Sequence, residues 1–98
     1  MNKLVKTYML PVGLGSDQVM QLPVDCEPLQ VTDQAGMPRL WALVDPSAAL
    51  QRRRVKLLRH NDPFADGENP DRYTYVGTVV VDSPPEETFH VFLGPIVA

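Results

Sequence analysis

Cysteine is almost absent from this 98-residue sequence, which contains Cys26 alone. A single cysteine excludes a disulfide within the chain and a multi-cysteine zinc site, so a reducing cytoplasm fits better than an export role. Long apolar runs are absent as well, because Lys3 and Lys6 interrupt the N-terminal stretch MNKLVKTYMLPVG. We therefore expect neither a signal peptide nor a membrane span.

The sequence also has none of the short motifs that mark common catalytic and cofactor sites. It contains no GxSxG, HExxH or phosphate-binding loop, and the acidic loop at 60–71 lacks the ligand spacing of an EF-hand. Asp25 and Glu27 flank Cys26 and should raise its pKa, which makes a poor nucleophile. His90 is expected to be a surface or hydrogen-bonded histidine. These absences predict a protein that is not an enzyme and needs no metal or cofactor.

What the chain does contain is a series of short stretches with alternating apolar and polar residues, the pattern of β-strands. The chain contains ten prolines, which divide it into short pieces and disfavour long helices. The stretches are 4–10, 18–24, 28–32, 37–45, 54–57, 72–82 and 88–93. A polar turn at 33–36 predicts a hairpin, a break is expected at 83–87, and DPSAALQ at 45–51 could form one helical turn. We expect one all-β domain over residues 1–98, with about seven short, mainly antiparallel strands in a single small sandwich or barrel.

The stretch RLWALVD at 39–45 holds the only tryptophan and is apolar at both parities. Because successive side chains of a strand point to opposite faces, both faces of this strand should require cover. We expect a central strand with Trp41 in the core; the alternative is that Trp41 is a contact residue of a binding surface. The residues expected to be buried are Leu29, Val31, Leu40, Trp41, Val44, Val55, Leu57, Val79, Val81, Phe89 and Val91.

Charge is unevenly distributed along the chain. The net charge of −3 argues against direct nucleic-acid binding. Five of the nine basic residues fall within one strand's length, and acidic residues crowd the two loops that follow it. The basic residues either protect an edge strand from pairing with other chains or, with the acidic loops, form a contact surface. The candidate partner-binding residues are Arg52, Arg53, Arg54, Lys56, Arg59, Asp62, Asp66 and Glu68.

Three stretches carry a resemblance to a known family: LWALVDP at 40–46, YVGTV at 75–79 and FHVF at 89–92. With the basic strand between the first two, they resemble small bacteriophage and prophage proteins whose chemistry is not assigned, over most of the chain from about Leu29 onward. Members often have a GTGHP-like turn after the basic strand, where this chain has LRHNDPF at 58–64. The resemblance implies the cytoplasm of a bacterial host and supplies no catalytic residue.

Small size, acidic loops and the lack of catalytic motifs then lead to an expectation about function. We expect a non-enzymatic phage or prophage accessory protein that binds a host protein or protein complex, as a stoichiometric, anti-CRISPR-like inhibitor of an antiviral defence complex. One alternative is a structural or assembly role in the virion, with strand edges making the contacts of a homo-oligomer. The other is an oligomer that sequesters a nucleotide signal between subunits with its arginines.

Overall fold

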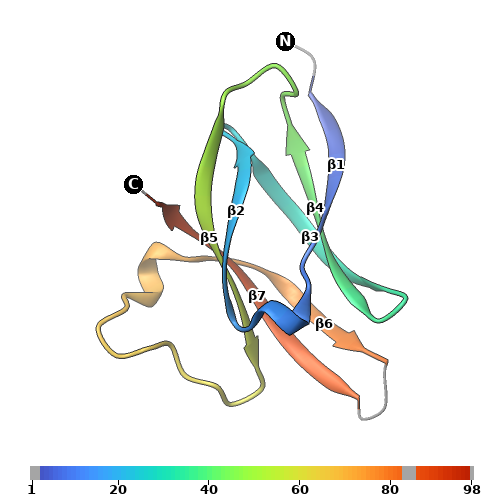
Figure 1. Cartoon of the computed structure of the whole chain (residues 1–98), viewed down its shortest axis with the longest axis vertical. Coiled ribbons are helices and arrows are strands. Elements are labelled where there is room, and N and C mark those ends of the chain that lie inside the picture. The colour runs from blue at the N-terminus through green and yellow to red at the C-terminus, as the bar shows by residue number, and fades with distance from the viewer. Residues whose placement is uncertain (1–2, 83–85, 98) are drawn as a thin grey trace.

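The computed structural model describes residues 3–82 and 86–97, and in this part of the chain it contains seven strands and two short 3₁₀ turns but no α-helix (Figure 1). The strands are β1 (Leu4–Met9), β2 (Asp17–Pro23), β3 (Glu27–Gln34), β4 (Met37–Val44), β5 (Leu50–Arg59), β6 (Thr74–Val81) and β7 (Glu87–Ile96). The 3₁₀ turns are η1 (Val12–Leu14) and η2 (Pro70–Arg72). The expected all-β architecture is confirmed, whereas most of the break expected at 83–87 lies outside the described residues.

The strands form two antiparallel sheets, with the orders β1-β4-β3 and β2-β5-β7-β6. The predicted hairpin at 28–45 is the β3–β4 pair. Its turn places Ala35 and Gly36 at φ values of 54° and 84°, and two residues with positive φ match the twist that connects antiparallel strands most closely. β1 is the third strand of this sheet and pairs with the other side of β4, where Thr7 lies opposite Trp41.

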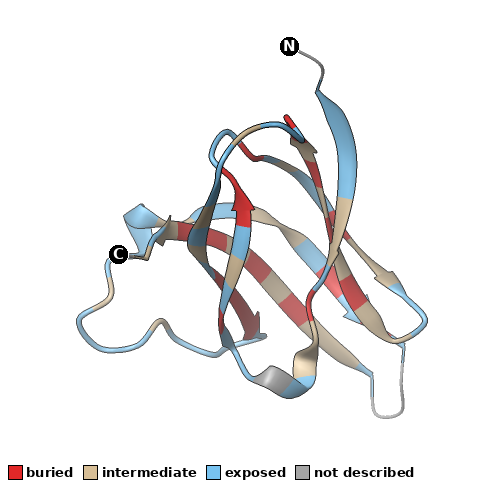
Figure 2. Ribbon diagram, turned by 45° about the horizontal axis from the view of Figure 1, so that its top comes forward, coloured by how far each residue is buried: buried red, intermediate tan, exposed pale blue. Residues whose placement is uncertain are grey.

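One core lies between the inner faces of the two sheets. In β4 every second residue is buried, namely Pro38, Leu40, Ala42 and Val44, and the other sheet contributes side chains such as Leu57. Figure 2 shows the buried positions on both sheets. All of the residues expected to be buried are buried except Leu29 and Trp41.

Those two expectations were wrong for different reasons. Leu29 is 47% exposed because a bulge between Pro28 and Gln30 shifts the register of β3 against β4, and a bulge re-aims the side chain it contains. Trp41 is half-buried on the outer face of β4, where its indole Nε1 donates a hydrogen bond of 2.8 Å to Thr32 Oγ1. β4 is central in its sheet, but only one of its faces lies against the core.

No helical turn forms at 45–51. The chain instead makes a tight turn in which Asp45 Oδ1 accepts hydrogen bonds from the Ser47 amide at 2.9 Å and the Ser47 hydroxyl at 2.7 Å. Aspartate commonly stabilises turns in this way. The same hydrogen bonds from Ser47 lower the pKa of the Asp45 carboxyl. β5 therefore begins directly after the turn and is longer than expected, from Leu50 to Arg59.

Candidate functional site

The long loop at 60–73 folds against the outer face of the four-stranded sheet, beside β5 and β7 (Figure 1). Aromatic contacts hold it there. The Phe64 ring lies 5.3 Å from the Phe92 ring of β7 and 5.3 Å from the Tyr73 ring, and Tyr75 of β6 lies 5.4 Å from Phe92. Tilted aromatic pairs at such distances add to the stabilisation from apolar burial. The sheet thus has a small second cluster on the side away from the main core.

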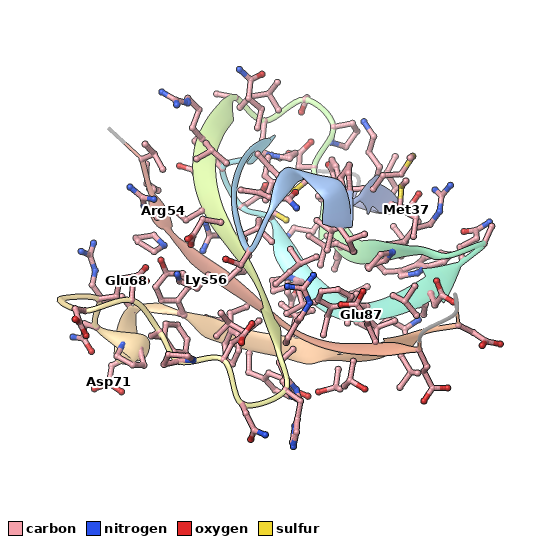
Figure 3. All side chains as sticks on the ribbon, turned by 60° about the horizontal axis from the view of Figure 1, so that its bottom comes forward. Met37, Arg54, Lys56, Glu68, Asp71 and Glu87 are labelled. Atoms are coloured by element: carbon pink, nitrogen blue, oxygen red, sulfur yellow. The ribbon has the colours of Figure 1, made fainter. Side chains whose placement is uncertain are left out.

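Lys56 of β5 lies under this loop and is only 2% exposed. Its Nζ is 2.6 Å from Asp17 Oδ1 of β2 and 2.5 Å from Glu68 Oε1 of the loop. The same ammonium group lies 5.6 Å from the centre of the Phe64 ring and 5.7 Å from that of Tyr73. A buried charge needs both a counter-charge and hydrogen bonds, and Lys56 has them from residues distant in the sequence. In Figure 3 the labelled Lys56 and Glu68 lie side by side.

Glu68 is held in one position by several groups. Besides Lys56, the Ala65 amide donates a hydrogen bond to its Oε1 at 3.0 Å, and the Tyr73 hydroxyl donates one to its Oε2 at 2.8 Å. The hydrogen bond from Lys56 lowers the pKa of the Glu68 carboxyl, burial opposes this effect, and the bonds from Tyr73 and Ala65 add to the lowering. Burial on its own would lower the pKa of Lys56, but the hydrogen bonds that its ammonium donates to Asp17 and Glu68, together with the charges of these carboxylates, outweigh burial, so that pKa is raised. The pair is therefore charged at neutral pH.

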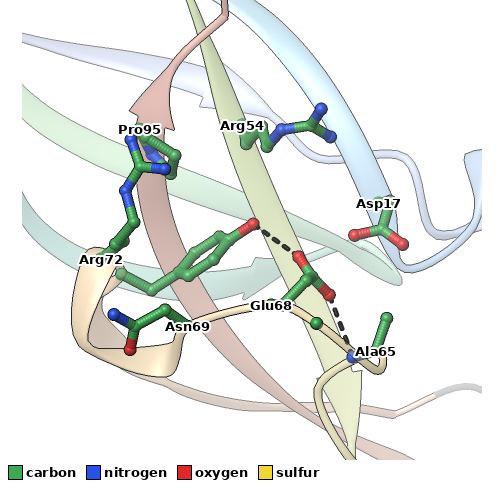
Figure 4. Close-up of a pocket in the computed structure, with 9 residues that line it drawn as sticks. Asp17, Arg54, Ala65, Glu68, Asn69, Arg72 and Pro95 are labelled. Atoms are coloured by element: carbon green, nitrogen blue, oxygen red, sulfur yellow. Dashed lines mark hydrogen bonds between the residues drawn. The ribbon is translucent and has the colours of Figure 1, made fainter.

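A pocket of about 430 Å³ opens beside this ion pair, between the loop and the edge of the sheet. Its lining includes Asp17, Glu68 and Tyr73, together with Arg54 of β5 and Arg72 of η2. Figure 4 shows Arg54 on the Asp17 side of the pocket and Arg72 beside Pro95. Among the residues that the structure describes, neither arginine makes an ion pair or a side-chain hydrogen bond. The pocket thus has fixed carboxylates within it and two free guanidinium groups at its border.

The candidate partner-binding residues do not form one continuous surface. Arg52 and Arg54 are exposed on the outer face of β5, and Asp62 and Asp66 are exposed in the loop. Lys56 and Glu68 form an ion pair with each other, and the Lys56 ammonium is buried, so a protein partner cannot contact it. Neither the basic strand nor the acidic loop is therefore a uniform charged surface.

The other two basic residues also have internal partners. Arg53 Nε donates a 3.0 Å hydrogen bond to the Gly94 carbonyl oxygen, and Arg59 Nε lies 2.5 Å from Glu87 Oε2. β5 is paired on both sides, with β2 and β7, so Arg54 and Lys56 do not protect an edge strand. The sheet thus brings Arg59 and Glu87 together although they are far apart in the sequence.

The part of the outer face of the three-stranded sheet that lies over β1 and β4 is largely apolar, whereas the paired residues of β3, such as Gln30 opposite Trp41 and Thr32 opposite Arg39, are polar. We call it the Trp41 face, and it consists of Val5 and Met9 of β1 and of Met37, Arg39, Trp41 and Leu43 of β4. Val5 is 53% and Met9 48% exposed, and the four residues of β4 are half-buried. The signal was present in the sequence, since RLWALVD is apolar at both parities, and the position of Trp41 on this outer face fits the alternative expectation of a contact residue better than the expectation of a core residue.

Arg39 adds a charge to the Trp41 face. Its Nη1 lies 3.4 Å from Thr7 Oγ1. In residues 3–82 and 86–97 it has no ion-pair partner. Tryptophan and arginine are the residue types most enriched among the energetic centres of protein interfaces. The face therefore combines an exposed apolar surface with an uncompensated positive charge.

Two histidines that are distant in the sequence meet on the outer face of the four-stranded sheet. His60 Nδ1 lies 3.5 Å from His90 Nε2, and His90 Nδ1 lies 2.9 Å from Thr78 Oγ1. Thr78 in turn contacts the Tyr75 hydroxyl at 2.5 Å. His90 is thus hydrogen-bonded, as predicted. These contacts link side chains of β6 and β7 and the start of the loop at 60–73 on one face of the sheet.

Cys26 is buried and 8% exposed. Burial is the main cause that raises the pKa of its thiol; Arg53 opposes the shift and Asp25 adds to it. A thiol of raised pKa is a weak nucleophile, in agreement with the sequence-based prediction. The sequence-based reason, the acidic neighbours, is the smaller part of the cause.

Residues 1–96 match the model of one protein family, described as Domain of unknown function (DUF7352). No curated protein and no solved structure matches the chain. In the part of the chain that the structure describes, no helix is long and apolar enough to cross a membrane.

Proposed function

The chain belongs to the DUF7352 family, and since that description assigns no activity, we propose from its surfaces that it is a non-enzymatic protein that binds a protein partner through the Trp41 face. The observation that carries this proposal is the outward position of Trp41 beside Arg39, on a sheet face with exposed Val5 and Met9. Exposed apolar side chains gathered on one face indicate an interaction site.

The partner that fits this face has an apolar surface with a carboxylate placed to meet Arg39. Trp41 and Leu43 supply the area to be buried, and the Arg39 guanidinium, which has no ion-pair partner among the described residues, supplies the charge that selects and orients the partner. We further propose, from the resemblance to phage and prophage proteins, that the partner is a host protein or complex of antiviral defence in the bacterial cytoplasm, which the chain inhibits stoichiometrically.

Affinity capture from host lysate tests this proposal when it is run with three forms of the chain. The parent and V80A should capture the same host protein, because Val80 is 46% exposed but lies on β6 of the other sheet. W41A should lose that protein while it stays folded. Capture that is equal for all three forms would contradict the use of the Trp41 face. Inhibition of the captured target by the chain far below equimolar amounts would mean turnover and would contradict a non-enzymatic role.

The alternative is a structural or assembly role in the virion, in which a second copy of the chain would cover the Trp41 face. β1 is an edge strand of its sheet, so a second copy that covers the Trp41 face would also approach an unpaired strand edge. Sedimentation of the purified parent distinguishes the two. A stable oligomer that dissociates in W41A would favour assembly, whereas a monomer favours a host partner.

A further inference from the structure

We propose that the pocket between β5 and the loop at 60–73 binds a small phosphate ester through Arg54 and Arg72. This site is separate from the Trp41 face and goes beyond the proposed function, because it assigns the chain a small-molecule ligand. The two guanidinium groups border the same pocket although 18 positions separate them in the sequence.

Lys56 with its two carboxylates carries one more negative than positive charge, so this cluster leaves no positive charge for a ligand. The Lys56 ammonium is buried and contacts both Asp17 and Glu68, so it cannot leave them for an incoming anion without leaving two carboxylates uncompensated. Arg54 and Arg72 have no such partners in the described residues. They are therefore the two cations that an oxyanion in this pocket can meet.

The guanidinium group suits a phosphate in particular. Its planar set of N–H donors bonds two oxygens at once, and a phosphate presents several oxygens to donors on different sides. Arg54 lies on the Asp17 side of the pocket and Arg72 beside Pro95 (Figure 4). A tetrahedral phosphate has acceptor positions for both groups when the two side chains turn toward it, whereas one planar carboxylate has fewer acceptor positions to share.

The rest of the lining favours an ester that carries hydroxyl groups over a free inorganic ion. Asp17 is 57% exposed and uses only Oδ1 for Lys56, so Oδ2 is free to accept a hydrogen bond from a ligand hydroxyl. The Tyr73 ring and Pro95 supply an apolar wall. At about 430 Å³ the pocket falls in the usual size range of small-molecule sites. Sugar phosphates and nucleoside monophosphates share this chemistry.

The pocket is preorganised by the contacts that hold its wall. Glu68 is fixed by Lys56, the Ala65 amide and the Tyr73 hydroxyl. The Asn69 side chain accepts a hydrogen bond of 3.0 Å from the Asp71 amide, which holds the start of η2 and hence the backbone of Arg72. A ligand therefore needs to order only the two arginine side chains, which keeps the entropic cost of binding small.

Isothermal titration tests the site with ribose 5-phosphate, adenosine 5′-monophosphate, inorganic phosphate and adenosine as the probes. The variants are R54Q and R72Q, with R52Q as the matched control, because Arg52 lies on the outer face of the same strand but does not line this pocket. We expect the parent to bind a phosphate ester, R54Q and R72Q each to bind it about tenfold or more weakly, and R52Q to bind it as the parent does. Raised salt should weaken binding in the parent.

Several results would overturn the proposal. They are the absence of binding of either ester at millimolar concentration, adenosine binding as tightly as its monophosphate, or an equal loss in R52Q and R54Q. Ribose 5-phosphate binding as tightly as the nucleotide would assign the site to the sugar phosphate, and tighter nucleotide binding would assign it to nucleotides. W41A should keep the ester and lose the protein partner, so failure of this proposal is distinguishable from failure of the proposed function.

Discussion

At the scale of single residues, Lys56 is the most consequential side chain outside the main core. It is fully buried yet charged, and its partners Asp17 and Glu68 come from β2 and from the loop at 60–73. Its position between Val55 and Leu57, which face the main core, places Lys56 on the outer face of β5. The loop then covers that face, and a loop's path over a sheet is set by aromatic packing between residues distant in the sequence.

We predict that K56M lowers the free energy of unfolding by about 3 kcal/mol, because removal of one partner of a buried ion pair leaves the other charge uncompensated. R52M is the matched control on the same strand. Arg52 is exposed, so this change should stay within about 0.5 kcal/mol of the parent. Urea unfolding at neutral pH measures both. A loss below about 1 kcal/mol in K56M would mean that the ion pair is not closed in solution.

The lowered pKa of Glu68 predicts a particular loss of stability in acid. Because the folded state favours ionised Glu68, its contribution is fully present above the ordinary glutamate pKa of about 4.3 and is lost as the pH falls through the lower folded-state pKa. The difference in unfolding free energy between the parent and E68Q should therefore be largest near neutral pH and shrink below pH about 4. Unfolding curves between neutral pH and pH 3 measure it, and a difference that does not change with pH would contradict the assignment.

At the scale of elements, β7 and the loop at 60–73 pack closely where the Tyr73 ring lies against Gly94. A Cβ at Gly94 would lie 2.7 Å from Tyr73 Cδ1, so a side chain there must displace the ring that lines the pocket. We expect G94A to cost about 1–3 kcal/mol, as overpacked sites do, and to weaken ester binding. G13A is the control, since nothing lies within 4 Å of a Cβ at Gly13. Thermal unfolding of the two variants decides it: equal melting temperatures would show that the loop does not pack as described.

The position of Trp41 on β4 predicts that its side chain contributes moderately to the stability of the fold. Because Trp41 is half-buried on an outer face, W41A should cost about 1–2 kcal/mol, less than the roughly 3–5 kcal/mol of a fully buried tryptophan. The lost hydrogen bond to Thr32 is included in that figure. Denaturant unfolding of W41A gives the value directly. A loss of 3 kcal/mol or more in unfolding free energy would show that Trp41 is a core residue, which would contradict the binding proposal.

The elements also show what local sequence can and cannot predict. The β3–β4 hairpin was predictable because its turn and its alternation are neighbours along the chain. Leu29 was misplaced because a bulge depends on the partner strand. The turn at 45–51 was ambiguous because Ala48 and Leu50 permit a helix, and the hydrogen bonds from Ser47 to Asp45 favour the turn. The pocket was not predictable, since it requires Arg54 and Arg72 to meet through the path of a long loop.

At the scale of the whole molecule, charges that are segregated in the sequence become interleaved in space. Lys56 is paired with Glu68 and Arg59 with Glu87, so part of the charge of the basic strand and of the acidic loops is neutralised within the molecule, while residues such as Arg54 and Asp66 stay exposed. What is left for recognition is an apolar face with Arg39 on one sheet and a pocket with two free arginines on the other. In Figure 3 Met37 of the Trp41 face is drawn away from Lys56 and Glu68, in keeping with two sites that operate independently.

The central claim is that the Trp41 face holds a protein partner. Its most direct test is the dissociation constant of the captured partner for the parent, W41A and V80A, measured well below the melting temperature of each variant. An energetic centre of an interface contributes about 2 kcal/mol or more, which corresponds to a loss of about 30-fold in affinity. We predict a loss of that size for W41A and none for V80A. Binding by W41A within twofold of the parent would contradict the claim.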